Sequence, residues 1–218
     1  MDVYEAIHSR TTVREFDQRR IESEVLERIL SAGLCAPSND HMRSWEFIVL
    51  DDPTVRLQVI KPIPKTFTPK QVERILEGWG LHDETQRAMY LDAIPKQYAM
   101  LLGAPRLILP LFRQVTPLLK PGSLSDLNAF ASVWCCIENI LIAAASEGIF
   151  GVTRIPFEKE QRLLRETLGI PQDYMMPCFL ALGYPAPNAA QYKQFEYSAQ
   201  QKIHQNRWQN NTGGTAGL

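Results

Sequence analysis

The chain has 218 residues, a formal net charge of −1, 45% hydrophobic residues and 22% charged residues. This length suits one sizeable domain with a substantial buried core. Because the charges nearly balance, no global field would recruit nucleic acid or an anionic membrane. The N-terminus lacks the basic start and apolar run of a secretory signal, and the longest apolar segment, 137–145, is too short to span a bilayer. We therefore expect a cytoplasmic protein that binds neither nucleic acid nor membrane.

Cysteine and histidine usage argues against a metal site and a disulfide framework. The chain has 4 cysteines and 4 histidines, and no two cysteines have the C-x-x-C spacing. The adjacent pair, Cys135 and Cys136, would point in different directions on a helix. We expect free, mostly buried thiols in a reducing compartment and no bound metal.

The first third of the chain reads as two helices and a strand. Asp2 followed by Glu5 forms a capping-box pattern, which predicts a helix over 2–9. Apolar residues at helical spacing predict a second helix over 23–33. Alternating residues over 45–50 predict a strand, which Asp51-Asp52-Pro53 ends.

The middle of the chain is the least regular part. Thr68 with Pro69 predicts a helix that runs to about Glu77, whereas residues 81–103 give no clear pattern. An apolar run over 105–112 predicts a strand, and its internal Pro110 favours an edge position or an early end.

The last part begins with the most apolar segment of the chain. Ser125 is the expected N-cap of a long helix ending near Glu147, and its apolar residues cover so much of its circumference that it must lie centrally. A helix over 157–168 and a strand over 178–184 follow. Irregular alternation of helices and strands predicts an α+β fold with a mixed sheet flanked by helices, rather than a regular βαβ series.

Two short stretches carry the chemistry. The first, Ser9–Phe16, places two arginines and two threonines within five residues: Arg10, Thr11, Thr12 and Arg14. Guanidinium forks and hydroxyls are the donors that a phosphate monoester requires. The alternative is that the arginines are solvated surface charges or ion-pair partners of Glu5, Glu15 or Asp17.

The second stretch, Ala36–Phe47, is a loop of small and polar residues that runs into a strand. Such a loop can present donors to a flat heterocycle from a rigid scaffold. Its candidate binding residues are Pro37, Ser38, Asn39, His41 and Arg43. A plain turn, a structural histidine and an exposed arginine are the corresponding alternatives.

Together these stretches resemble the nitroreductase family of FMN-dependent oxidoreductases, which has an Arg-x-Ser-x-Arg-x-Phe-like segment followed by Ala-Pro-Ser-x-x-Asn-x-Gln-Pro-Trp. Thr stands here where the family often has Ser. His41, Arg43 and Ser44 stand where the family usually has Asn, Gln and Pro. These departures concern substrate choice and redox tuning more than the fold.

The resemblance implies further site residues. Glu147-Gly148 resembles the family segment whose backbone amide hydrogen-bonds flavin N5, with a plain helix C-cap at Gly148 as the alternative. Lys193 stands near the position of a third phosphate-binding cation, with Lys202 and Arg207 as rivals.

The resemblance also implies an architecture. It implies a single FMN-binding domain over 1–210 with a lid excursion over 61–103, followed by a disordered tail over 211–218. It places the long central helix at the interface of a homodimer, with FMN bound between the subunits. Three aromatic residues of the excursion could cover the flavin or pack in the lid's own small core: Trp79, Tyr90 and Tyr98.

The activity implied is an FMN-dependent oxidoreductase that uses NAD(P)H as co-substrate. Hydride would pass by way of flavin N5 to a small electron-poor acceptor, a nitroaromatic or a quinone, in a ping-pong cycle. The chain has no Gly-x-Gly-x-x-Gly or Walker loop, which costs a flavoenzyme nothing because the flavin carries the hydride. Two alternatives remain: a specialised flavoenzyme of the same fold, dehalogenase-like or flavin-fragmenting, and a non-catalytic flavin-binding or sensing protein.

Overall fold

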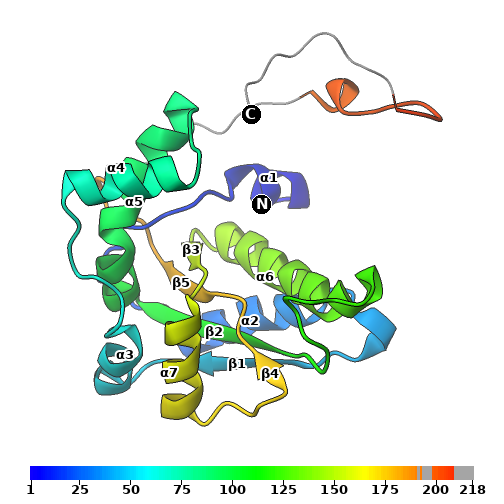
Figure 1. Cartoon of the computed structure of the whole chain (residues 1–218), viewed down its shortest axis with the longest axis horizontal. Helices are drawn as coiled ribbons and strands as arrows, with labels where there is room; N and C mark the ends of the chain where they lie inside the picture. The colour runs from blue at the N-terminus through cyan, green and yellow to red at the C-terminus, as the bar shows by residue number, and fades with distance from the viewer. Residues whose placement is uncertain (191, 193–197, 209–218) are drawn as a thin grey trace. The chain divides into compact units, whose positions relative to one another are not determined.

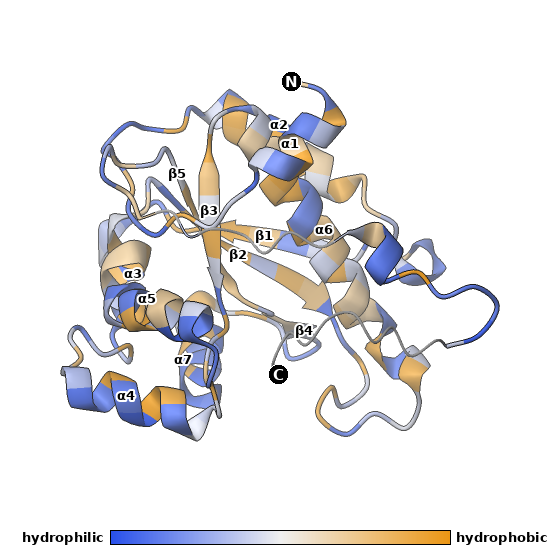
Figure 2. Ribbon diagram, turned by 90° about the horizontal axis from the view of Figure 1, so that it is seen from above, coloured by the Kyte–Doolittle hydropathy of each residue, from blue (hydrophilic) through white to orange (hydrophobic). Residues whose placement is uncertain are grey.

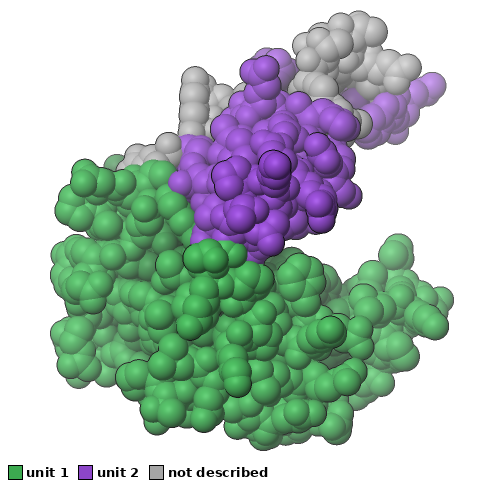
Figure 3. Space-filling view, turned by 60° about the vertical axis from the view of Figure 1, so that its left-hand side comes forward, with its two compact units in different colours: residues 1–66, 96–190 green, residues 67–95, 191–218 purple. Residues whose placement is uncertain are grey.

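The computed structural model describes residues 1–190, 192 and 198–208. The chain divides into two compact units, coloured separately in Figure 3. The first unit comprises residues 1–66 and 96–190, and the second comprises residues 67–95 and 191–218.

Within the described residues, seven α-helices and five strands follow one another irregularly, as Figure 1 shows. The helices are α1 (Val3–Ser9), α2 (Ser23–Leu34), α3 (Pro53–Ile60), α4 (Pro69–Gly78), α5 (Glu84–Gly103), α6 (Asn128–Ser146) and α7 (Glu158–Leu168). The strands are β1 (Trp45–Val49), β2 (Arg106–Arg113), β3 (Phe150–Arg154), β4 (Tyr174–Met175) and β5 (Phe179–Gly183). Three 3₁₀ turns complete the set: η1 (Asn39–His41), η2 (Leu124–Leu127) and η3 (Ala199–Gln201).

The strands form one sheet in the order β1-β2-β5-β3, and β4 pairs with the far end of β2. All named strand pairs are antiparallel. A parallel bridge joins Thr12 to Gly151 beside β3. The expected α+β fold, a sheet flanked by helices, is confirmed.

Alternation along β2 divides the main core into two layers. Leu107, Leu109 and Leu111 join a cluster with residues of α3, α5 and α7 on one face of the sheet. Ile108 and Phe112 join a second cluster with residues of α2 and α6 on the other face. Successive side chains of a strand point to opposite faces, so a strand that is buried throughout requires cover on both sides. Figure 2 shows the apolar colour concentrated on these strands and on α6.

Pro110 does not mark an edge strand, because β2 lies between β1 and β5. Leu107 accepts a bond from Leu50 on the β1 side, and Arg113 donates to Ser44 on that same side. The backbone N–H and C=O groups of odd-numbered residues in β2 therefore point toward β1, and the backbone of Pro110 points toward the opposite neighbour in the sheet. There, β5 pairs only as far as Ile108, and β4 begins opposite Phe112. Proline thus lies in a gap where no partner needs its missing N–H.

Helix α6 packs against α2 and β2, and its buried side includes Val133, Ile137 and Ile140. Helix α2 approaches closely at Gly33, where a Cβ would lie 2.5 Å from Ile140 Cγ1. Among the described residues, Leu124–Ser146 is the one stretch long and apolar enough to cross a bilayer by length and composition. Its packing in the second cluster accounts for that apolar character as that of a core helix.

Several predicted boundaries match the structure and others do not. The capping boxes of α1 and α4 are both formed, at Asp2 and Thr68. Ser125 does not cap the long helix: it lies inside η2, and α6 begins at Asn128. Helix α3 and strands β3 and β4 were not predicted. The ambiguous residues 81–103 largely form α5, with Pro95 inside it.

The second unit has its own apolar cluster. Val72, Leu76 and Ile94 are buried, and Tyr90 packs against them. Trp79 makes an edge-on contact with Tyr90 at a centroid distance of 5.4 Å. Tyr90 thus packs against the small core of the excursion, and Trp79, which is 51% exposed, packs against Tyr90 at its rim, whereas Tyr98 belongs to the main core of the first unit.

Candidate flavin site

The N-terminal basic segment is held against β3. Arg10 is the C-cap of α1, so the chain leaves the helix at that residue and becomes extended. Thr12 then forms its bridge to Gly151, and the Val13 amide donates to the Gly151 carbonyl at 3.2 Å. The buried Val13 side chain anchors the segment.

The segment's far end is fixed by the chain that follows β5. Phe16 forms an antiparallel bridge with Pro185, and the Asp17 amide donates to the Tyr184 carbonyl at 3.0 Å. Phe16 packs so closely over Gly183 that a Cβ there would lie 2.6 Å from Phe16 Cδ1. The phosphate-binding pattern is therefore carried on backbone tied down at both ends.

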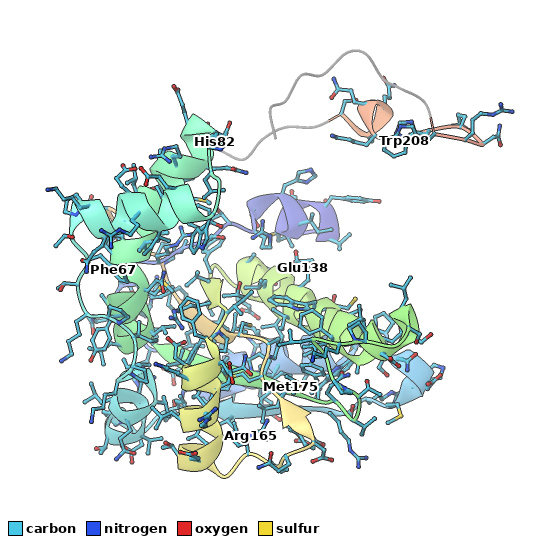
Figure 4. All side chains as sticks on the ribbon, viewed as in Figure 1. Phe67, His82, Glu138, Arg165, Met175 and Trp208 are labelled. Carbon is cyan, nitrogen blue, oxygen red and sulfur yellow. The ribbon has the colours of Figure 1, made fainter. Side chains whose placement is uncertain are left out.

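The two arginines have different surroundings. Arg10 Nε lies 3.5 Å from the Glu138 carboxylate, and Figure 4 shows Glu138 on the α6 face toward α1. Glu138 is none of the ion-pair partners weighed from the sequence. Arg14 lines a cavity of about 280 Å³, together with Glu15, Lys96 and Met100. Lys96 pairs with Glu15 at 3.0 Å.

The polar loop lies against the first turns of α6. The Asn39 amide donates to Ser132 Oγ at 3.0 Å, and Asn128 Nδ2 donates to Asn39 Oδ1 at 3.1 Å. Within the loop, the Arg43 amide donates to Ser38 Oγ at 3.1 Å. Ser38 and Asn39 are thus oriented by hydrogen bonds to α6 and within the loop. Asn128 and Ser132 were not predicted from the sequence as residues of this group.

This loop also stores backbone strain. Asp40, His41 and Arg43 have φ values of 50°, 52° and 46°, in the left-handed region. Each such residue costs on the order of 1–2 kcal/mol when it is not glycine. Strained conformations of this kind cluster at ligand-binding and catalytic sites. Two of the three residues that depart from the family pattern, His41 and Arg43, are held in this conformation.

Beneath the loop is a cavity of about 280 Å³. Its walls combine apolar side chains with hydroxyls and amides: Met42, Trp45, Ala129, Ser38, Ser44, Ser132 and Gln114. A flat heterocycle with one polar edge requires such a mixed lining.

Gln114 contributes a polar group of this cavity wall whose bonding is incomplete. Its Nε2 donates to the carbonyls of Thr116 and Asp126, at 2.9 Å and 3.1 Å, which fixes the orientation of the amide. Its Oε1 is buried and has no hydrogen-bond partner among the described residues. A buried carbonyl oxygen without a donor is unfavourable, so this wall suits a group that carries an N–H.

The two candidate groups lie at opposite ends of α6 within one chain. Asn39 bonds to Asn128 and Ser132 near the helix start, whereas Thr12 bridges to Gly151 beyond the helix end. At 1.5 Å per residue, Ser132 and Ser146 are separated by about 21 Å along the axis. Figure 1 shows β3 next to one end of α6, beside the segment that follows α1. A single chain does not bring the two groups together.

Glu147 and Gly148 form the C-terminal cap of α6. Gly148 has φ +72°, and both amides donate back to the helix, to Ala144 and Ala145. The Glu147 carboxylate pairs with Arg28 at 2.9 Å. In this structure, the backbone amides of both residues are thus used to cap α6, which is the alternative to a flavin contact. Lys193 lies outside the described residues.

Arg154, the last residue of β3, forms a buried ion pair inside the fold. It is buried and donates to both oxygens of Glu160, at 2.5 Å and 2.9 Å, and to Gln97 at 2.8 Å. All of these partners are internal to the fold. The residue therefore acts as a structural tie between β3, α5 and α7.

The fold and these two groups define a class: an α+β protein with a basic segment suited to a phosphate and a polar loop suited to a flat ring. The model of the nitroreductase family matches residues 7–184. The chain therefore belongs to the nitroreductase family.

Two relatives show how far the likeness extends. An iodotyrosine deiodinase from Nematostella vectensis is 27% identical over 194 residues, which are 86% of this chain and 69% of the relative. A protein from Archaeoglobus fulgidus, provisionally named an NADH dehydrogenase/NAD(P)H nitroreductase, is 27% identical over 208 residues, which are 93% of this chain and 96% of that protein.

A solved structure extends the likeness to three dimensions. The structure of oxidized iodotyrosine deiodinase bound to FMN and 3-iodo-L-tyrosine has a TM-score of 0.72 and 19% identity. The match covers 95% of this chain and 100% of that chain. The fold is thus shared at low sequence identity.

Proposed function

We propose that this chain is a cytoplasmic FMN-dependent oxidoreductase that takes hydride from NAD(P)H and passes it to a small electron-poor acceptor, a nitroaromatic or a quinone, by a ping-pong mechanism. Family membership supports the oxidoreductase class. The observation that carries the proposal is the presence of a phosphate-type segment and a ring-type loop near opposite ends of one helix, α6, where a second subunit could bring them together. FMN, when bound, supplies the hydride acceptor and donor at N5.

The basic segment would hold the phosphate. Arg10 and Arg14 would donate from guanidinium groups, and Thr11 and Thr12 would donate from hydroxyls. Because a phosphate monoester carries a charge near −2, a further cation would help, and Lys193 is our candidate. The tied backbone around Thr12 and Phe16 pre-sets these donors, which lowers the entropy lost on binding.

The loop would orient the ring. Ser38, Asn39 and His41 would bond the polar edge, with Pro37 shaping the turn, and Gln114 Oε1 would accept from a ring N–H. Arg43 would place positive charge near the N1 and C2 carbonyl region, which favours the anionic reduced form of a flavin and raises its potential. Glu147 and Gly148 would close the helix end near the ring. The structure offers their backbone carbonyls and Cα atoms here, since both amides already have acceptors.

A homodimer would unite the two groups. Consider a two-fold axis that is perpendicular to α6 and passes beside its middle. This axis sets the two copies of the helix antiparallel, so the start of one helix lies near the end of the other. The loop of one subunit then faces the basic segment of its partner. An exposed strip along α6 and the exposed apolar residues of α1 provide surface for this contact: Ala131, Cys135, Glu138, Val3, Tyr4 and Ile7.

Mixed dimers test this arrangement. Arg10→Gln would damage the phosphate group of a site, and Asn39→Ala would damage the ring group. Each homodimeric variant should lose FMN affinity. After subunit exchange, each mixed dimer should regain one intact site, because the undamaged loop and the undamaged segment then meet across the interface. Absence of any recovery, with exchange verified by mass spectrometry, would contradict a site shared between subunits.

Turnover is tested separately. The purified protein should carry flavin absorbance bands that bleach when NADPH or NADH is added anaerobically and return when a quinone is added. A protein that binds FMN but fails to bleach would be a flavin binder rather than an enzyme. A colourless protein that fails to take up added FMN would refute the proposal altogether.

The deiodinase relatives favour a second candidate within the same chemistry: reductive dehalogenation of a halogenated aromatic. Release of iodide from 3-iodotyrosine by the reduced protein would support this candidate. Turnover of quinones and nitroaromatics without iodide release would leave the first candidate alone.

A further inference from the structure

A separate cavity of about 260 Å³ lies where the end of β1, the start of β2 and the segment before α2 meet. It is lined by Arg20, Ile21, Asp51, Arg56, Pro105 and Arg106. None of these residues lines the cavity beneath the polar loop or the one beside Arg14. Neither the phosphate segment nor the ring loop uses this cavity, so its chemistry is independent of the function proposed above.

Arg106 forms the floor of this cavity. The residue is only 9% exposed. Its Nε and Nη2 donate to the Ile21 carbonyl at 3.1 Å and 2.8 Å, and its Nη1 donates to Asp51 Oδ1 at 2.8 Å. The contacts use one hydrogen on each nitrogen, and a guanidinium has five. Donor capacity therefore remains on Nη1 and Nη2.

Arg56 forms a second wall. Its Nε and Nη2 donate to the Leu50 carbonyl, at 3.1 Å and 2.7 Å, and its Nη1 donates to the carbonyls of Ala104 and Leu102, at 2.7 Å and 3.2 Å. Backbone carbonyls carry no net charge, so these bonds fix the guanidinium without neutralising it. Burial lowers the pKa of Arg56, Asp51 opposes that shift, and Arg106 lowers the pKa further. Arg106 is therefore close enough to repel Arg56.

Arg20 stands at the mouth. Its side chain is exposed, and it has neither a hydrogen bond nor an ion pair within the part of the chain that the structure describes. The lining thus holds three guanidinium groups and a single carboxylate, a net charge of two positive units. The neighbouring Asp52 is not part of the lining, and its carboxylate is turned to the start of α3, where it accepts from the amides of Thr54 and Val55.

We propose that this cavity is a binding site for a small tetrahedral oxyanion, phosphate or the phosphate group of a monoester. A buried arginine is normally paired with an anion, and Arg106 has Asp51. The half-buried Arg56 bonds only to backbone carbonyls, and the exposed Arg20 adds a third positive charge to the lining. Guanidinium groups bind phosphate oxygens through paired N–H donors. The bound anion connects the segment before α2 to α3 and β2, so its occupancy stabilises the sheet edge on which β1 lies.

The test is a calorimetric titration of the FMN-saturated protein with inorganic phosphate at constant ionic strength. Saturation with FMN removes the phosphate segment around Arg10 as a competing site. Wild-type protein binds phosphate saturably, and Arg20→Gln binds about tenfold more weakly because one charge-assisted interaction is lost. Arg162→Gln is the matched control: its side chain is 72% exposed on α7, and the same change of net charge leaves phosphate affinity unaltered.

A second arm uses glycerol 3-phosphate to distinguish the free ion from an ester; tighter binding of either identifies which source the site serves. The same titration in an Arg10→Gln background serves if the protein does not retain FMN, so failure of the flavin proposal does not obscure this result. Absence of saturable phosphate binding in the wild type overturns the inference. Equal phosphate affinity in the wild type and in Arg20→Gln overturns it as well.

Discussion

Gly183 lies directly under the ring of Phe16: a Cβ added at Gly183 would be 2.6 Å from Phe16 Cδ1 and 2.7 Å from Pro105 Cδ. The absence of a side chain in β5 thus lets the basic segment lie flat beside the sheet. We expect Gly183→Ala to lower the free energy of unfolding by about 1–3 kcal/mol through overpacking, and to weaken FMN binding because Arg14 is displaced. Urea unfolding and FMN titration measure the two effects.

The control for this change is Gly103→Ala in α5, where a Cβ would meet nothing within 4 Å. Alanine at this helix terminus should leave stability unchanged or raise it by no more than about 1 kcal/mol. An equal loss in both variants would show that the contact with Phe16 is not the cause.

Removing one partner of the buried ion pair between Arg154 and Glu160 should destabilise the protein more than removing both partners together. Glu160→Gln leaves an uncompensated guanidinium inside the fold, and we expect a loss of about 3–5 kcal/mol in the free energy of unfolding. The double change Arg154→Met with Glu160→Leu removes both charges and should recover most of that loss. Arg162→Gln, at an exposed pair with Glu158, should stay within about 0.5 kcal/mol of the wild type. A double variant no more stable than Glu160→Gln would contradict this account.

The cysteines should differ in their reactivity toward iodoacetamide. Burial raises the pKa of Cys136 and of Cys178 to about 12, whereas Cys35 and Cys135 are exposed in the single chain. Iodoacetamide at pH 8 should therefore label Cys35 in the native dimer, Cys135 as well once the subunits are dissociated, because Cys135 lies on the proposed contact strip of α6, and all four thiols only after unfolding. Intact-protein mass spectrometry counts the labels, and peptide mapping assigns them.

The same burial predicts a dependence of stability on alkaline pH. An unfolded cysteine loses its proton near pH 8.5, whereas these two native thiols keep theirs to about pH 12. Their raised native pKa favours the folded state below pH 8.5, and that contribution declines as pH rises from 8.5 toward 12. Cys178→Ala should show a shallower fall of the urea midpoint over this range. An unchanged slope would rule out the Cys178 contribution.

In the strained loop, one substitution should stabilise the protein rather than destabilise it. Asp40 has φ 50°, so Asp40→Gly removes a left-handed strain of about 1–2 kcal/mol but adds about 0.5–1 kcal/mol of chain entropy to the unfolded state. We expect stability to be retained or to rise by up to about 1.5 kcal/mol. Asp40→Val should instead lose stability, since a β-branched residue fits this conformation poorly. Thermal unfolding of the two variants distinguishes these outcomes.

Local signals explain how much of the fold could be predicted from the sequence. The caps at Asp2 and Thr68 act within three residues, and both helices begin as the sequence predicts. The Asp-Asp-Pro sequence was read only as the end of a strand, although the same residues also start α3 by capping at Asp52. The edge position predicted from Pro110 is wrong. A proline is accepted in this central strand because it lies opposite the gap between β5 and β4, and no local sequence pattern encodes that gap.

The candidate site divides in the same way. Arg10, Arg14, Ser38 and Asn39 could be proposed because each group is contiguous in sequence. Gln114 and Ser132 could not, since both lie more than sixty residues beyond the loop in sequence: Gln114 lines the cavity beneath it, and Ser132 accepts from the Asn39 amide. The separation of the two groups along α6 is likewise a tertiary property.

The length of α6 sets the distance between the polar loop and the basic segment. The start of the helix fixes the polar loop, its end leads into the strand that fixes the basic segment, and the number of residues between them sets the spacing. One added turn would lengthen that spacing by about 5.4 Å, more than a hydrogen bond can absorb. The length of α6 is therefore constrained as well as its buried side chains, and an insertion there should be far more damaging than one in the loop between β2 and α6.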